Sequence, residues 1–313
     1  MHHALVPLVV LTAALASLAA EAQSGEGAGS LFRGYSAGEF KGMSYRWMKP
    51  PNCDAKKSYP LVLSLHGRAG VGTDNRENLR GWNTTIINRD EWREEHPCFV
   101  LAPQNDFAWV RPATVKASVQ ARGGEAFVAG LDKKARRYVR VQLGKPDYSG
   151  LAVVFDLIAK FREDFSVDGQ RIYVIGNSMG GYGAWAAMQE EPDLFAAGVA
   201  ACGGQCIHLG LDRIKHVPVW AFHGTADKIV PYEKSRKAFE ELKKLGGNCK
   251  LTSLKGQGHG IWRIAFRYAG DNPAKGYTTE YSSEECDREG DVWQWLFSQR
   301  KPAAAGAAGK EGK

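Results

Sequence analysis

The sequence lacks an apolar run at its N-terminus that is long enough for a comfortable membrane span. The run at residues 4–18 falls short of the roughly 20 residues that a spanning helix needs. It is followed by Ala20-Glu21-Ala22, a small-x-small cleavage pattern, so we expect residues 1–22 to be a secretory signal peptide. A signal peptide usually begins with Lys or Arg, whereas this segment has His2 and His3. The alternative is a membrane anchor that is not cleaved. We therefore expect a secreted or periplasmic protein with no membrane association after cleavage.

The sequence also lacks the signatures of nucleic-acid binding, although its formal net charge is +7. There is no zinc-finger spacing and no aromatic RNA-binding motif, and the basic residues are mostly scattered. A solvated loop or helix face explains their one dense cluster, and an anion-binding patch for an acidic polysaccharide is the alternative. We expect no nucleic-acid partner. The cluster consists of Lys133, Lys134, Arg136, Arg137 and Arg140.

Cysteine is scarce, with six residues in 313. An even number in an exported chain permits up to three disulfides, whose pairing the sequence leaves open. Cys98 and Cys202 lie in apolar runs, so buried thiols are the alternative for them. No second pair matches the Cys202–Cys206 spacing, and we therefore expect no metal site and no cofactor. The six are Cys53, Cys98, Cys202, Cys206, Cys249 and Cys286.

Large apolar residues are absent from residues 301–313, so we expect a disordered, solvated tail there. No internal repeat is visible. The composition, with 44% hydrophobic and 11% aromatic residues, is sufficient for a sizeable core. The length that remains suits a single α/β catalytic domain over residues 23–300 better than two small domains.

Short apolar runs alternate with helical patterns along this domain. Helical spacing of apolar residues predicts helices over 150–165, 232–245 and 291–298. The alternation predicts a mostly parallel sheet flanked by helices on both faces, with right-handed crossovers. Residues 105–145 show no clear period, and we interpret them as an insertion near the active site, a partial lid. The predicted strands are 59–65, 98–102, 171–176, 194–201, 217–222 and, closing the series, 249–254.

The strongest local motif is Gly176-Asn177-Ser178-Met179-Gly180. It comes directly after the predicted strand 171–176 and before a helical run, the context that a nucleophile elbow requires. Flanking glycines allow close approach of the chain, and the helix N-terminus supplies partial positive charge. The motif therefore predicts Ser178 as the nucleophile, with an ordinary glycine-rich turn as the alternative.

A catalytic serine needs a base and an orienting acid, which follow it in this fold in the order acid, then His. Asp227 follows the predicted strand 217–222, and His259 follows the strand 249–254. The alternatives are a helix cap for Asp227 and a surface loop histidine for His259. His223 competes for the role of base, but it precedes Asp227, and we expect it to hydrogen-bond its own turn.

Two backbone N–H groups are needed to bind an oxyanion. The first prediction is the amide of Met179, the residue after the nucleophile. The second donor should come from the loop after strand 59–65, where we assign Arg68, with Ala69 as second choice. The alternative for His66-Gly67 in this loop is a simple strand-ending turn.

These motifs as a set resemble a known family. YPLVLSLHGRAGVGTDN, CFVLAPQ, RIYVIGNSMGGYGAW, PDLFAAGVAACGG, VPVWAFHGTADKIVP and GQGHGIW are similar to segments of the secreted esterases related to feruloyl and acetylxylan esterases and polyhydroxybutyrate depolymerases. These are relatives of the prolyl-oligopeptidase and dienelactone-hydrolase branch. The resemblance spans residues 59–297 and implies the α/β-hydrolase fold, with Ser178, Asp227 and His259 on the family's triad. Residues 105–145 match no family pattern.

The sequence therefore predicts a serine carboxylic-ester hydrolase that works through an acyl-enzyme, without a cofactor. Small-molecule or polysaccharide-linked esters are the expected substrates, and the resemblance favours feruloyl or acetyl esters. The alternatives are a prolyl-oligopeptidase-like serine peptidase, for whose propeller residues 23–58 leave no room, and a catalytically inactive hydrolase-fold binding module. Trp109 and Trp262 are candidates for an acyl pocket, with core packing as the alternative. The oligomeric state stays open.

Overall fold

The computed structural model describes residues 32–301 with short gaps. The expected signal peptide, 1–22, and residues 302–313 of the expected tail lie outside the described residues. Within the described part, no helix is both long and apolar enough to cross a membrane. The gaps are residues 111, 122, 131–132, 134–135, 137–139, 141–142, 145–149 and 206–209.

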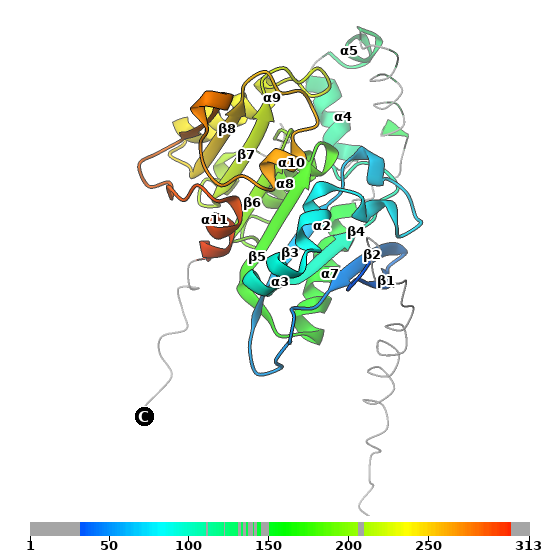
Figure 1. Ribbon diagram of the computed structural model, residues 1–313. Coiled ribbons are helices and arrows are strands. Elements are labelled where there is room, and N and C mark those ends of the chain that lie inside the picture. Colours follow the sequence, from blue (N-terminus) through cyan, green and yellow to red (C-terminus); the bar gives the residue numbers. More distant parts are fainter. Residues whose placement is uncertain are drawn as a thin grey trace, which may run out of the picture.

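A single sheet runs through the described part of the molecule (Figure 1), with the strand order β1-β2-β4-β3-β5-β6-β7-β8-β9. The strands from β4 to β8 in this order are parallel, whereas the pairs β1–β2, β2–β4 and β8–β9 are antiparallel. The predicted fold class, an α/β-hydrolase with a mostly parallel sheet, is confirmed. The bounds are β1 Ser36–Phe40, β2 Met43–Met48, β3 Tyr59–Leu65, β4 Phe99–Pro103, β5 Val167–Asn177, β6 Ala197–Ala201, β7 Val219–Gly224, β8 Cys249–Leu254 and β9 Tyr277–Tyr281.

Each of the six predicted strands is present, but the sheet extends beyond them at both edges. The prediction that 249–254 closes the series is wrong, because β9 pairs with β8. The hairpin β1–β2 likewise precedes the first strand that the sequence predicted. These edge strands were missed because they have no continuous apolar run: β1 and β9 are half-exposed along most of their length, and β2 alternates.

Helices cover both faces of the sheet. One face packs against α7 (Gly150–Asp164), α8 (Met179–Glu190) and α9 (Glu233–Lys244). The other packs against α2, α3, α10 and α11. The three helices predicted from apolar spacing are therefore confirmed as α7, α9 and α11. The remaining bounds are α2 Trp82–Ile87, α3 Asp90–Glu95, α4 Pro112–Ala121, α5 Glu125–Gly130, α10 Trp262–Ala265 and α11 Val292–Ser298, with 3₁₀ turns η2 Arg68–Gly70, η3 Glu77–Leu79, η4 Asp212–Ile214 and η5 Pro273–Lys275.

Strand β3 shows why the central strands read as continuous apolar runs. Successive side chains of a strand point to opposite faces. Leu61, Leu63 and Leu65 join the core under α7 and α8, while Val62 joins the core on the opposite face. All seven residues of β3 are buried, since helices lie on both sides.

The segment 105–145 is not uniform. Trp109, near its start, is fully buried in the core, whereas α4 and α5 lie at one end of the molecule (Figure 1). The basic cluster is described only in part, since Lys134 and Arg137 lie outside the described residues. Arg140 pairs with Glu125 at 2.6 Å. The partial lid remains a prediction.

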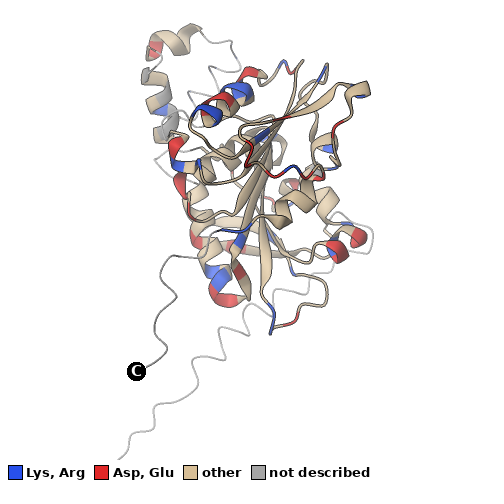
Figure 2. Cartoon of the chain, turned by 90° about the vertical axis from the view of Figure 1, so that its left-hand side faces the viewer, with Lys and Arg blue, Asp and Glu red and all other residues tan. Residues whose placement is uncertain are grey.

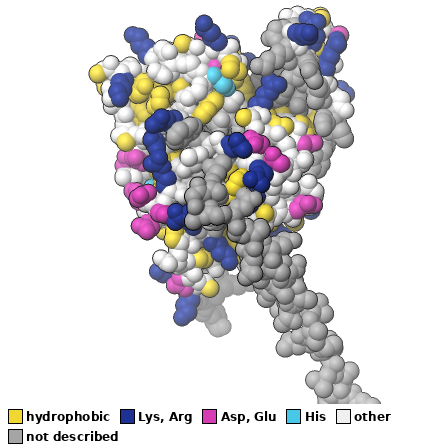
Figure 3. Space-filling model, turned by 45° about the vertical axis from the view of Figure 1, so that its right-hand side comes forward, with side chains coloured by type: hydrophobic (Ala, Val, Ile, Leu, Met, Phe, Trp, Pro, Cys, Tyr) yellow, Lys and Arg dark blue, Asp and Glu magenta, His cyan; other side chains and the backbone are white. Residues whose placement is uncertain are grey.

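Charged side chains of both signs are mixed over the surface. Lys and Arg lie among Asp and Glu along the chain (Figure 2) and on the face shown in Figure 3. Several form ion pairs within one helix, including Lys160–Asp164 on α7 and Arg236–Glu240 on α9. The charged residues of α7 and α9 therefore pair at the surface, and the interpretation of the basic cluster as a solvated loop or helix face stays a prediction.

Candidate active site

Ser178 lies between β5 and α8 in a backbone conformation that side chains rarely adopt. Its φ is +55° and its ψ is −117°. The turn is held by hydrogen bonds from Ser178 N to Ala201 O, at 2.8 Å, and from Tyr182 N to Ser178 O, at 3.0 Å. A strained residue of this kind persists only where its surroundings fix it, and such residues cluster at functional sites.

The two glycines of the motif allow this turn to pack closely. A Cβ on Gly176 would lie 2.1 Å from Gly180 O, and one on Gly180 would lie 2.1 Å from Leu65 O. Both distances are to backbone atoms and are too short for any side chain to replace hydrogen. The close approach of β3, β5 and α8 therefore requires the Gly-x-Ser-x-Gly pattern, which an ordinary turn would not need.

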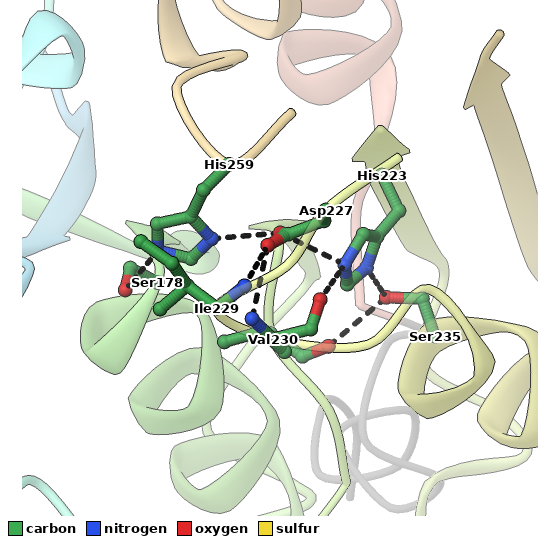
Figure 4. A network of polar contacts seen from close by, with 8 residues as sticks. Ser178, His223, Asp227, Ile229, Val230, Ser235 and His259 are labelled. Atoms are coloured by element: carbon green, nitrogen blue, oxygen red, sulfur yellow. Dashed lines mark hydrogen bonds and ion pairs between the residues drawn. The ribbon is translucent and has the colours of Figure 1, made fainter. Parts of the chain in front are cut away.

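The structure brings Ser178, Asp227 and His259 together. Ser178 Oγ lies 2.8 Å from His259 Nε2, and His259 Nδ1 lies 2.7 Å from Asp227 Oδ2 (Figure 4). Ser178 follows β5, Asp227 follows β7 and His259 follows β8, and these strands are parallel. Their carboxyl ends lie at one edge of the sheet, where open α/β folds form their ligand sites.

The carboxylate of Asp227 is buried and surrounded by hydrogen-bond donors. Oδ1 accepts from the backbone N–H groups of Ile229, at 2.8 Å, and Val230, at 2.9 Å. Burial by itself would raise the pKa of Asp227, but the hydrogen bonds from His259, Val230 and Ile229 outweigh it and hold the pKa below its ordinary value. Asp227 is therefore ionised at neutral pH. Its side chain caps the turn at Ile229 and Val230 and not a helix N-terminus, which was the alternative for it.

His223 is fully buried on the other side of Asp227. Its Nε2 lies 3.0 Å from Val230 O, which confirms the expected bond to its own turn. Two further contacts were not foreseen: Nε2 lies 3.3 Å from Asp227 Oδ2, and Nδ1 lies 2.7 Å from Ser235 Oγ. Burial lowers the pKa of His223, against the opposing effects of Val230 and Asp227.

The predicted oxyanion donors lie on two adjoining turns. Met179 is the first residue of α8 and Arg68 the first residue of η2, positions whose N–H groups have no partner within the helix. A Cβ on Gly67 would lie 2.8 Å from Asn177 Nδ2, so the loop after β3 packs directly on the nucleophile turn. This placement is compatible with the assignment of both amides, which stays a prediction.

The loop that carries Arg68 is held by His66, part of the turn that the sequence predicted for the oxyanion loop. His66 Nδ1 donates to Gly67 O at 2.8 Å, and Nε2 accepts from Asn105 N at 3.0 Å. Trp109 Nε1 donates to His66 O at 3.0 Å. Burial lowers the pKa of His66 to about 4, so the ring stays neutral in this bonding pattern.

The two tryptophans proposed for an acyl pocket have different environments. Trp109 is fully buried, so the core alternative holds for it. Trp262 is half-buried, and its ring meets that of His259 edge to face at 4.9 Å between centroids. Ile229, which follows Asp227 closely, is 66% exposed. Trp262 and Ile229 therefore offer apolar surface beside the three polar residues.

The described cysteines are all free thiols in this structure, and Cys206 lies outside the described residues. Cys202, His223 and Asp227 place their ligand atoms within 4.8 Å of one another. Burial raises the pKa of the Cys202 thiol, and both nitrogens of His223 already have hydrogen-bond partners. Since a metal would need a thiolate and a free nitrogen there, this donor set fits one poorly.

Comparison with known proteins finds similarity to esterases. Residues 141–271 match a family described as phospholipase/carboxylesterase, and they contain Ser178, Asp227 and His259. The chain is 30% identical over 81 residues to the bifunctional acetylxylan esterase/xylanase XynS20E of Neocallimastix patriciarum, which is 26% of this chain and 12% of that protein. It is 27% identical to a thermostable esterase of known structure, with a TM-score of 0.62, over 87% of this chain and 64% of the other.

The fold, together with these matches, defines the class: the protein is an α/β-hydrolase. Within that class it is similar to carboxylesterases, and the resemblance drawn from the sequence motifs is confirmed. The chain spans less than two thirds of the length of either relative.

Proposed function

We propose that the protein hydrolyses carboxylic esters through an acyl-enzyme on Ser178. The observation that carries the proposal is the continuous line of hydrogen bonds from Ser178 Oγ through His259 to Asp227, at 2.8 and 2.7 Å. An ionised Asp227 accepts the Nδ1 proton of His259, which leaves Nε2 free to accept the serine proton. This is the protonation pattern that serine activation requires.

The reaction follows from that pattern. Ser178 Oγ attacks the ester carbonyl while His259 Nε2 takes its proton, and Asp227 stabilises the charged ring. The N–H groups of Met179 and Arg68 bind the oxyanion, and His259 then protonates the departing alcohol. Water repeats the steps on the acyl-enzyme and releases the acid. No metal or cofactor takes part.

The proposed substrates are acetyl or feruloyl esters, either small or linked to a polysaccharide. The relative from Neocallimastix patriciarum supports acetyl esters of xylan, since its name includes acetylxylan esterase. Trp262 and Ile229 provide an apolar surface beside His259 that suits a methyl or aromatic acyl group. Export by the N-terminal segment, into a periplasm or the medium, is part of the same proposal.

Ser178→Ala tests the proposal directly. We expect it to fold normally, shown by circular dichroism, and to lose hydrolysis of p-nitrophenyl acetate by at least about 1,000-fold. Ser166→Ala is the control, because Ser166 is exposed and remote in the fold, with its hydroxyl on Ala55 O. Normal turnover by Ser178→Ala would contradict the assignment.

Two further assays separate the alternatives. A fluorophosphonate probe labels an active serine hydrolase and would leave an inactive binding module unlabelled. Comparing an ester with a matched proline anilide distinguishes an esterase from a prolyl-oligopeptidase-like peptidase. A screen of acetyl, feruloyl and hydroxybutyryl esters then identifies the acyl group.

A further inference from the structure

His223 is the only other ionisable side chain in the described residues that an ion pair joins to Asp227. It lies near the end of β7, the strand that leads into the Asp227 loop, and its side chain is fully buried. Ser235, on α9, is also fully buried and completes the contact on the far side of the ring (Figure 4). The two residues therefore form a second polar layer behind the carboxylate.

The position of the ring proton follows from its neighbours. His223 Nε2 faces Val230 O, a carbonyl that can only accept, and the ionised carboxylate of Asp227. Two acceptors require that Nε2 carries a proton. Nδ1 lies 2.7 Å from Oγ of Ser235, whose hydroxyl donates to Gly203 O at 3.0 Å. Burial lowers the pKa of His223 and so favours the neutral ring.

This proton adds a further positive partner for Asp227. Oδ1 accepts from the N–H groups of Ile229 and Val230, Oδ2 lies 2.7 Å from His259 Nδ1, and His223 Nε2 lies 3.3 Å from Oδ2. The Nε2–H of His223, which is hydrogen-bonded to Val230 O, therefore stabilises the carboxylate electrostatically beside its three hydrogen bonds. The contact from His223, at 3.3 Å, is the longest of the four and comes from the side opposite His259 (Figure 4).

We propose that His223 is a positioning residue that holds Asp227 toward His259 and limits the basicity of its carboxylate. The inference rests on the proposed function of the three residues. With its Nε2–H in place, the carboxylate keeps its orientation as the ring of His259 gains and loses charge. Ser235 fixes the ring of His223 by binding Nδ1, which links the Asp227 loop to α9.

The proposal predicts a direction for the pH dependence. A carboxylate that loses a donor becomes more basic and stabilises a charged His259 more strongly. The acid limb of kcat/KM then moves to higher pH. The titratable groups around His223 in the described part are Asp227, His259, Tyr232 and Cys202, whose buried thiol stays neutral.

Three variants test the role of His223, with p-nitrophenyl acetate as substrate. His223→Leu removes the donor, and we expect kcat to fall by about 10- to 100-fold, by analogy with the loss of residues that hydrogen-bond the ligands of a metal. KM should stay unchanged, because His223 does not reach the substrate side of His259. His223→Gln can return an N–H to Asp227 and should recover most of kcat. Ser235→Ala should have a smaller effect in the same direction.

His216→Gln is the control, since His216 is half-exposed and faces Asp193 on the surface. A folded His223→Leu with unchanged kcat and an unchanged acid limb would overturn the proposal. Equal losses in His223→Leu and His223→Gln, without movement of the acid limb, would also overturn it, because they indicate packing alone. Circular dichroism confirms folding of each variant.

A measurement that needs no ester separates this proposal from the proposed function. The low-field proton resonance of His259 Nδ1–H reports its hydrogen bond to Asp227, and it can be followed in Ser178→Ala as well. We expect the chemical shift of this resonance to change in His223→Leu and to return with His223→Gln. An unchanged chemical shift overturns the positioning role, whereas a changed chemical shift in a protein that cleaves no ester contradicts only the proposed function.

Discussion

At the scale of single residues, the site depends on a backbone turn at Ser178 that tolerates few other residues at the neighbouring positions. Ser178 has a positive φ, and the glycines on either side of it meet backbone atoms at distances that no Cβ could tolerate. The strain at Ser178 turns the side chain out of the strand and helix that flank it. Because this turn requires glycine at 176 and 180, the short motif was sufficient to place the turn at Ser178.

Sequence reasoning found Ser178, Asp227 and His259 because each lies directly after a strand with a strong apolar signal. It missed the contacts of His223 with Asp227 and Ser235 and those of His66 with Asn105 and Trp109, because these partners come from other elements. The bond from Ser235 to His223 joins α9 to β7, and that from Asn105 to His66 joins two loops. Such contacts depend on packing, which a single sequence does not display.

Lys250 gives a prediction for the pH dependence of stability. Its ammonium is buried 3.6 Å from the ring centroid of Trp220, and burial lowers its pKa to about 8 from an ordinary 10.5, against the opposing charges of Asp287 and Glu289. Between these values the unfolded chain binds more protons than the folded chain, so this group makes the free energy of unfolding rise with pH. We expect about 1–2 kcal/mol across this window.

Urea unfolding at pH 8 and pH 10.5 measures this contribution. In Lys250→Met the free energy of unfolding should rise less between these two pH values than it does in the wild type. In Lys243→Met, which changes an exposed position on α9, it should rise as much as in the wild type. If Lys250→Met retains the whole difference, burial of the ammonium is not its source.

At the scale of elements, the inner strands were predictable and the edges were not. Strands from β4 to β8 are covered on both faces and therefore read as apolar runs, whereas β1 and β9 expose much of their surface and resemble loops. The boundaries shifted for a related reason. The run 194–201 begins as a turn, and only Ala197–Ala201 pairs with β5.

The start of helix α11 is defined by one side chain, that of Asp291. Asp291 accepts hydrogen bonds from Trp293 N, at 2.8 Å, and Gln294 N, at 3.0 Å. Asp291→Ala should lower the free energy of unfolding by about 1 kcal/mol, the usual cost of losing such a cap. Asp291→Asn retains an acceptor and should cost much less. Denaturant midpoints of the two variants measure the difference, and equal losses would contradict the capping role.

At the scale of the whole molecule, one sheet collects residues that are far apart in sequence. The chain passes through β5, β6, β7 and β8 in spatial order, and each parallel crossover returns it to the same carboxyl edge. Ser178 and His259 meet there although 81 positions separate them. Topology alone was therefore sufficient to predict the meeting of the three side chains, but not the shape of the surface around them.

The central claim is that Ser178 carries the acyl group during ester cleavage. The most direct measurement is peptide mass spectrometry after mixing the protein with p-nitrophenyl acetate and quenching with acid within one turnover. The account predicts one acetyl group on the peptide that contains Ser178, and none on Ser178→Ala. Ester turnover without acetylation of Ser178, or with the acetyl group on another side chain, would contradict it.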